Sequence, residues 1–250
     1  MSKKNTDLNY ELREITVSVE NLNKYYGDIK ASDNINFRAY KGDVIALLGP
    51  NGAGKSTLMN MISGYLAPSS GKIEVMGKDI ALFALQSKEN IGFLPEGAPL
   101  YPDISVKMFL SYMAQLRGVG KKELNEAIEK ANIKEVLHQK IETLSKGYQR
   151  RVGFAQSILS NPPVLLLDEP TDGLDPNQKD YIRALIKQMA KDKTIIISTH
   201  LLEEAETVCN RIILIDKGKI KADGNLEQIL KTAGAENLSG AFRKLTAKEN

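Results

Sequence analysis

The chain has 250 residues, of which 42% are hydrophobic and 26% are charged, a composition typical of a globular protein with one large domain or two small ones. Its 34 Lys and Arg residues nearly balance 31 Asp and Glu residues, and the two signs are interspersed, so the charge favours no nucleic-acid partner. No stretch approaches the roughly 18 consecutive apolar residues of a membrane-spanning helix. The N-terminal residues lack a signal-peptide pattern, and the one cysteine, Cys209, cannot form an internal disulfide. We therefore expect a cytoplasmic protein that reaches a membrane only through a partner.

The first third of the chain predicts strands around one helix. Residues 15–22 alternate between apolar and polar types, and residues 44–49 form an apolar run that ends in a glycine-rich turn. Residues 72–77 and 91–94 predict further strands. The helix is predicted by four residues spaced as one apolar face: Leu58, Met61, Ile62 and Tyr65.

From about residue 99 to 160 the pattern is helical only, which predicts an all-helical insert subdomain. Apolar strand runs then return, separated by amphipathic helices, at residues 164–167, 194–198, 211–216 and 219–224. Alternating strands and helices predict an α/β fold with a largely parallel sheet. The core should comprise residues 1–98 and 161–232, and residues 233–250 form a C-terminal tail whose pattern predicts no element.

The strongest motif is GPNGAGKST, which fits the pattern G-x-x-x-x-G-K-[ST] between a strand and a helix. Its backbone N–H groups can surround phosphate oxygens, Lys55 can reach the terminal phosphates, and Ser56 can offer its hydroxyl to Mg²⁺. The alternative is a glycine-rich turn without a ligand, which the strand before and the helix after make less favourable. The candidate nucleotide-binding residues are Gly49, Pro50, Asn51, Gly52, Ala53, Gly54, Lys55, Ser56 and Thr57.

Two further strand ends carry side chains suited to phosphate chemistry. Asp168 and Glu169 follow the run VLLL, where Asp168 could hold Mg²⁺ and Glu169 could orient or deprotonate a water molecule. His200 follows TIIIST. Each could alone be an ordinary polar strand end, but the carboxyl ends of parallel strands face one crevice. We therefore expect the glycine-rich turn, the acidic pair and His200 to meet.

The stretch TLSKGYQRR, residues 143–151, precedes a helical apolar pattern, so Ser145 is placed to cap a helix. The basic residues Lys146, Arg150 and Arg151 suggest a helix start that meets an anion. The alternative is a simple cap with a solvated basic face.

Together these motifs resemble the ATP-binding subunit of an ABC transporter, in the right order over about residues 15–230. GPNGAGKS resembles Walker A, VLLLDE resembles Walker B with its catalytic glutamate, and LSKGY resembles the signature usually written LSGGQ. TDGLD, residues 171–175, resembles the D-loop, and His200 resembles the catalytic switch histidine. The resemblance implies a P-loop NTPase fold of the RecA-like type, with an N-terminal antiparallel β part and a helical insert, and it implies ATP and Mg²⁺ as cofactors.

The resemblance also implies roles for residues outside these strands. Tyr26 matches the aromatic residue that stacks on adenine, and Glu96 stands at the Q-loop position, a further candidate Mg²⁺ ligand. Ser145, Lys146 and Gly147 would contact ATP held by a second chain. Lys146, Tyr148 and Glu96 depart from the commonest family pattern in a way that resembles the ABC-2-type exporter branch, which includes gliding-motility-like and drug-efflux ATPases.

In this family such a subunit forms a head-to-tail dimer around two ATP molecules and drives transport through a separate membrane permease. The resemblance therefore implies an ATPase at the inner face of the cell membrane that powers export, with a second ATP-binding subunit, in a homodimer, and a permease as partners. One alternative is a non-transport ABC-type ATPase, although the long coiled-coil insertion or second fused half of such proteins is missing. Another is a nucleotide-dependent switch that does not hydrolyse ATP. Such a switch would lack the catalytic carboxylate, whereas this chain has Glu169.

Overall fold

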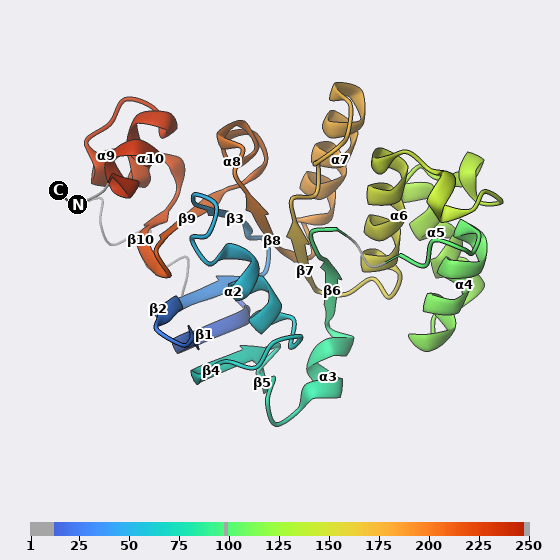
Figure 1. Cartoon of the computed structure of the whole chain (residues 1–250), viewed down its shortest axis with the longest axis horizontal. Helices are drawn as coiled ribbons and strands as arrows, with labels where there is room; N and C mark the ends of the chain where they lie inside the picture. Colours follow the sequence, from blue (N-terminus) through green and yellow to red (C-terminus); the bar gives the residue numbers. More distant parts are fainter. Residues whose placement is uncertain (1–12, 98–99, 248–250) are drawn as a thin grey trace.

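The computed structural model describes residues 13–97 and 100–247, which form two β-sheets with helices around them (Figure 1). The strands are β1 (Ile15–Tyr26), β2 (Ile29–Tyr40), β3 (Val44–Leu48), β4 (Ser70–Val75), β5 (Lys78–Asp79), β6 (Ile91–Leu94), β7 (Val164–Asp168), β8 (Thr194–Thr199), β9 (Arg211–Asp216) and β10 (Lys219–Gly224). The helices are α2 (Lys55–Ile62), α3 (Ala84–Glu89), α4 (Val106–Leu116), α5 (Lys121–Lys130), α6 (Lys146–Ile158), α7 (Pro176–Met189), α8 (Leu202–Val208), α9 (Leu226–Ala233) and α10 (Leu238–Thr246).

The larger sheet has the order β10-β9-β3-β8-β7-β6 among the described residues. Strands β9, β3, β8, β7 and β6 are parallel, and β10 joins the edge antiparallel to β9. Strands β3, β7 and β8 are buried along their whole length, as expected for parallel strands covered on both faces. The predicted α/β fold with a largely parallel sheet is confirmed.

Successive side chains of each parallel strand enter different cores, because side chains alternate across a sheet. In β7, Leu165 and Leu167 pack with the helical insert, whereas Val164 and Leu166 pack with α2 and the antiparallel sheet. Both faces of the sheet at β7 are therefore packed against other elements. A rigid edge of this kind can hold side chains at fixed positions.

The smaller sheet, β2-β1-β4-β5, is antiparallel and shares a core with α2. Helix α2 ends at Ile62, and Gly64 adopts a left-handed φ of 69°. The predicted apolar face is therefore wrong at its last position: Tyr65 lies beyond the helix end and is 83% exposed. Met59, fully buried, joins the core instead.

Between β6 and β7 the described chain forms α4, α5 and α6 with two short 3-10 turns, Lys134–Val136 and Ile141–Thr143, and one isolated bridge, Ser105 to Lys140. This is the helical insert that the sequence predicts, and in Figure 1 it lies at the end of the molecule opposite α9 and α10. Its limits of 99 and 160 stay a prediction.

The C-terminal region differs from the prediction, because much of the expected tail is a packed helix. Leu238 and Ala241 of α10 are fully buried in a core shared with α8, α9 and β9. Asn225 forms a capping box at α9, and Asn237 caps α10.

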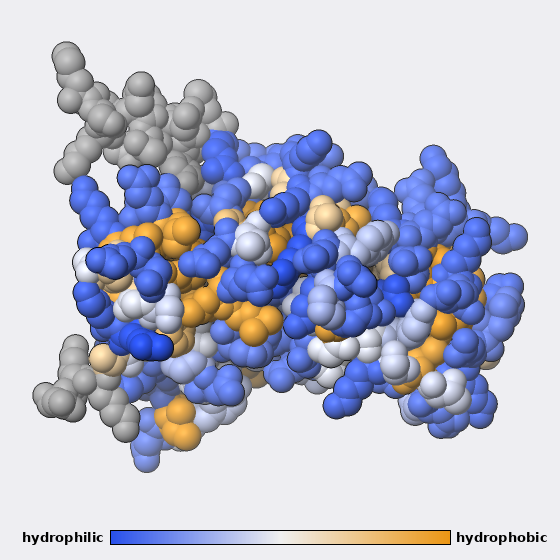
Figure 2. Space-filling view, turned by 90° about the horizontal axis from the view of Figure 1, so that it is seen from above, coloured by the Kyte–Doolittle hydropathy of each residue, from blue (hydrophilic) through white to orange (hydrophobic). Residues whose placement is uncertain are grey.

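Figure 2 shows a mostly hydrophilic face on which apolar side chains gather toward both ends of the molecule. None of the helices in the described ranges is long and apolar enough to cross a membrane.

Candidate nucleotide-binding site

The turn between β3 and α2 forms a cradle whose shape depends on glycine. Gly54 has a φ of 103°, and a Cβ atom added there would lie 2.1 Å from the carbonyl oxygen of Ala31. Only glycine tolerates both this conformation and this approach. No side chain caps the N-terminus of α2, so the N–H groups of its first turn lack the partner that a capping residue would supply.

Lys55 lies at the start of α2 and is 7% exposed. Its Nζ donates hydrogen bonds to the carbonyl oxygens of Gly49, at 2.7 Å, and Pro50, at 3.1 Å. Burial lowers the pKa of Lys55, and the nearby carboxylates of Glu169, Asp168 and Glu96 oppose this shift. A buried ammonium group folded back onto the turn is placed to meet a phosphate.

A cavity of about 440 Å³ opens in front of this cradle. Its walls come from the β2 start, the glycine-rich turn, the loop after β6, and the ends of β7 and β8: Ile29, Lys30, Ala31, Asn51, Gly52, Ala53, Gly54, Lys55, Ser56, Thr57, Glu96, Asp168, Glu169, Asp172, Ser198 and His200. The three strand ends that the sequence points to one crevice therefore meet in one cavity.

Glu169 and His200 are in direct contact, with 2.7 Å between Oε1 of Glu169 and Nδ1 of His200. The Glu169 side chain is mostly buried, whereas half of the imidazole is exposed. Burial raises the pKa of Glu169, and the hydrogen bond with His200 opposes that rise. This carboxylate can thus accept a proton or orient a water molecule more readily than a solvated one.

Asp168 is buried beside the cradle, and its Oδ1 has no hydrogen-bond partner among the described residues. A buried carboxylate oxygen without a hydrogen-bond partner costs free energy, unless a ligand binds to it. No cluster of three or more His, Cys, Asp or Glu side chains within the described ranges could hold a metal unaided. Asp168, Ser56 and Glu96 offer the oxygen ligands that Mg²⁺ prefers, in a cavity where phosphate oxygens can supply the rest.

The N-terminus of α6 lies outside this cavity. Ser145 caps the helix as predicted, with Oγ accepting from the Tyr148 N–H at 3.3 Å, and Lys146 and Gly147 form its first turn. The alternative of a solvated basic face is wrong for Arg150 and Arg151, which are buried and donate to main-chain carbonyl oxygens instead. Tyr148 turns toward the 3-10 turn Lys134–Val136, where its hydroxyl donates to Glu135, and Arg151 lies over its ring.

Tyr26 lies at the end of β1, paired with Ile29, and is 49% exposed. Ile29 lines the cavity, but Tyr26 is not among its lining residues in the described part of the chain. Sequence reasoning missed the contribution of Lys30 and Ala31, because their approach depends on how the antiparallel sheet packs. It also missed Ser198, although this residue ends the same strand run that indicated His200.

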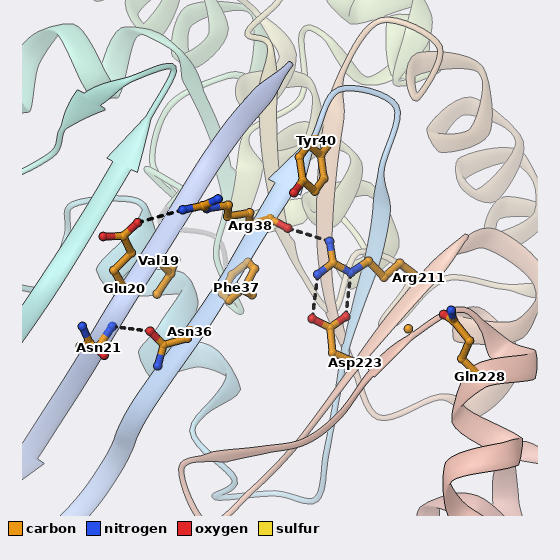
Figure 3. A pocket seen from close by; sticks show the side chains of 11 residues that line it. Val19, Glu20, Asn21, Asn36, Phe37, Arg38, Tyr40, Arg211, Asp223 and Gln228 are labelled. Atoms are coloured by element: carbon orange, nitrogen blue, oxygen red, sulfur yellow. Dashed lines mark hydrogen bonds and ion pairs between the residues drawn. The ribbon is translucent and has the colours of Figure 1, made fainter. Parts of the chain in front are cut away.

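A second cavity, of about 620 Å³, lies between β1, β2, β9, β10 and α9 (Figure 3). Arg211 makes a bidentate ion pair with Asp223, with both distances at 2.7 Å, and also donates to the Arg38 carbonyl oxygen at 2.6 Å. The Asn21 N–H donates to Asn36 Oδ1 at 2.8 Å. Of these contacts, the bond from Arg211 of β9 to the Arg38 carbonyl oxygen of β2 joins the two sheets, so the cavity lies at a structural junction between them.

The fold and the first cavity define a P-loop ATPase. The chain matches the family described as ABC transporter over residues 32–172. It is 39% identical over 239 residues, covering 93% of this chain and 86% of the relative, to an uncharacterized ABC transporter ATP-binding protein of Methanocaldococcus jannaschii. It is 35% identical to the linearmycin resistance ATP-binding protein of Bacillus subtilis, covering 89% of this chain and 73% of that protein.

Its fold is also similar to a solved dimeric structure of an ATP-binding cassette in a post-hydrolysis state bound to ADP and Pi. The TM-score is 0.78 at 26% identity, and the match covers 84% of this chain and 98% of that one. This chain belongs to the ABC transporter family, and it is an ATP-binding subunit of the ATPase type.

Proposed function

We propose that the chain hydrolyses ATP as a head-to-tail dimer and so drives export through a separate membrane permease, to which it binds at the cytoplasmic side of the membrane. The observation that carries the proposal is the meeting of Lys55, Asp168 and the Glu169–His200 pair in one cavity. A binding module without hydrolysis would have no need of a mostly buried carboxylate held by a histidine.

We assign binding of the phosphates to residues 49–57 and contact with the adenine end to the β1–β2 hairpin, with Tyr26 as the stacking residue. Asp168, Ser56 and Glu96 would hold Mg²⁺, which when bound supplies positive charge that offsets the charge developing on the phosphates. Glu169 orients or deprotonates the attacking water, and His200 donates a hydrogen bond that fixes the carboxylate.

The γ-phosphate would receive a second set of contacts from the partner chain, because none of the residues that line the cavity in the described chain belongs to α6. The N-terminus of α6 supplies a positive helix end, and Ser145, Lys146 and Gly147 would approach that phosphate from the partner chain. Hydrolysis removes the group that both halves share, so the closed dimer loses its advantage in free energy and opens.

Docking of the permease is supported by a third cavity, of about 610 Å³, at the boundary of the core and the helical insert. It is bordered by Tyr65 after α2, Glu96 after β6 and Arg117 after α4. Lys88 of α3 lines this cavity, and Leu82 and Leu85, just before α3 and within it, are more than three-quarters exposed. Exposed apolar side chains on an element that borders a hollow are typical of a surface that a partner covers. Export is supported by the resistance function in the name of the Bacillus relative.

The proposal is tested with Glu169→Gln, which keeps the shape of the side chain and removes its charge. This variant should bind ATP with Mg²⁺, hydrolyse it at least about 100-fold more slowly, and accumulate as a dimer in size-exclusion chromatography. A Glu169→Gln chain that turns over ATP at the wild-type rate would contradict the proposed role of Glu169. A variant that stays monomeric with saturating ATP would contradict the proposed dimer.

A further inference from the structure

Arg150 is a buried residue of α6 that contacts both acidic segments of the cavity. Its side chain is 8% exposed. Nη1 donates to the carbonyl oxygen of Pro95 at 2.8 Å, and Nη2 donates to the carbonyl oxygen of Glu169 at 2.7 Å. Since Pro95 directly precedes Glu96, one guanidinium group fixes the backbone beside both carboxylates.

The backbone of Glu169 needs such support. Its φ of 50° is uncommon for a residue with a side chain and persists only where neighbouring groups hold it. The Glu169 N–H donates to the Ser198 carbonyl oxygen at 2.9 Å, and its own carbonyl oxygen accepts from Arg150 and from the Asp172 N–H, the latter at 3.1 Å. Because the backbone sets where the side chain points, these bonds decide the position of the carboxylate.

Arg150 also links this carboxylate to the helix end that we assign to the partner's nucleotide. It lies in α6 five residues after Ser145, so the rigid first turns of the helix connect the two. Burial lowers the pKa of Arg150, and the carboxylates of Asp168, Asp172 and Glu169 oppose this shift. The guanidinium group thus lies on a helix that contacts the backbone of Glu169 in its own chain and carries the proposed contact with the second chain.

We propose that Arg150 is a positioning residue for ATP hydrolysis, which transmits contact of residues 145–147 with one nucleotide to the Glu169 that acts on the other. This inference rests on the proposed function, since it requires a dimer in which each chain serves both sites. It gives each chain a direct mechanical connection between its two half-sites.

The neighbouring Arg151 provides a matched control. It is also buried, at 4% exposed, but it donates to the Asn132 carbonyl oxygen at 2.8 Å and lies over the Tyr148 ring, within the helical insert. A change at Arg151 perturbs the same helix without releasing Glu169. Comparison of the two positions therefore separates positioning from simple stability of α6.

The first test measures ATP affinity, unfolding temperature, kcat and the Hill coefficient for Arg150→Gln, Arg150→Lys and Arg151→Lys. Arg150→Gln should bind ATP normally but lose on the order of 10- to 100-fold in kcat, with the Hill coefficient falling toward one. Arg150→Lys keeps the buried cation, reaches only one of the two carbonyl oxygens, and should recover part of kcat. Arg151→Lys should lower the unfolding temperature and leave kcat near the wild-type value.

Wild-type kcat in folded Arg150→Lys would overturn the proposal, and so would equal losses of kcat at positions 150 and 151. If Arg150→Gln does not fold, the comparison of the two lysine variants decides. A wild-type chain without ATPase activity would instead overturn the proposed function itself.

The second test uses mixed dimers in which one chain carries Lys55→Ala, so that only the other chain's P-loop turns over ATP. Arg150→Lys in the chain with the intact P-loop should lower kcat, because it releases the Glu169 that acts there. Arg150→Lys in the Lys55→Ala chain should leave kcat close to that of the unmodified mixed dimer. Loss only in the second arrangement would show that Arg150 acts through the signature alone and would overturn the proposal.

Discussion

The N-termini of α2 and α6 are both suited to an anion, but they are built differently. Helix α2 begins at Gly54 with no capping side chain, lines the nucleotide cavity and has the buried Lys55 in its first turn. Helix α6 is capped by the hydroxyl of Ser145 and lies outside that cavity. The end of α2 has no side-chain acceptor for its N–H groups, whereas at the end of α6 one N–H group, that of Tyr148, already has one.

This difference teaches how a shared site can be divided between two copies. The end that lacks a cap should bind ATP by itself, because phosphate oxygens supply the missing acceptors. The capped end adds contacts only after the first half has bound. Affinity for ATP should therefore depend on α2, and turnover on both helices.

The largest effect is expected at Lys55. Lys55→Ala removes the buried cation of the cradle and should weaken ATP binding by at least about 100-fold, since charge-assisted hydrogen bonds are the strong ones. Equilibrium binding of ATP to the purified chain measures this. Lys72→Ala, at an exposed lysine of β4, serves as control and should bind normally. Unchanged affinity in Lys55→Ala would remove the assignment of the P-loop.

His200 should control the pH dependence of turnover. The hydrolysing form needs ionised Glu169, whose pKa is raised by burial and lowered by the bond with His200. His200→Ala removes the hydrogen bond that lowers the pKa of Glu169, so this pKa rises further. On acidification, the variant should therefore lose activity at a higher pH than the wild-type chain. The pH–rate profile should show its acid limb displaced upward. His138→Ala, at the exposed histidine of the helical insert, should leave that limb in place. An unmoved limb in His200→Ala would contradict the coupling.

A smaller effect is expected at the cap of α6. Ser145→Ala leaves the Tyr148 N–H without its acceptor and should cost about 1 kcal/mol of unfolding free energy, which lowers Tm by about 2–4 °C. Turnover should fall as well, whereas ATP binding should not. Asn225→Ala removes the capping box of α9 and should lower Tm to a similar extent with turnover intact. Full turnover in Ser145→Ala would contradict a role for the Ser145 hydroxyl in hydrolysis.

The sequence indicated the cradle and the strand ends because each is local. A glycine-rich turn between a strand and a helix, or acids after VLLL, can be recognised without knowing what packs nearby. Parallel strands bring such ends to one edge. For that reason the positions of Lys55, Asp168, Glu169 and His200 in one cavity could be predicted.

Features that depend on packing between distant segments could not be predicted from the sequence. Arg150 and Arg151 suggested a helix start that meets an anion or, as the alternative, a solvated basic face. Both are buried instead, because their partners Pro95, Glu169 and Asn132 come from other elements. Helix α10 was missed since its few apolar residues indicate burial only once α8 and α9 are placed beside it. The contribution of Lys30 and Ala31, from the antiparallel sheet, to the cavity gave no sequence signal.

The central claim, that each ATP is bound between the P-loop of one chain and the signature of the other, is tested most directly by mixing two inactive variants. Ser145→Arg chains keep the P-loop and lose the signature, and Lys55→Ala chains do the reverse. Neither should hydrolyse ATP alone. Mixed in equal amounts, they form dimers with one intact shared site, and the account predicts that ATPase activity returns. A mixture that stays inactive although mixed dimers form would contradict it.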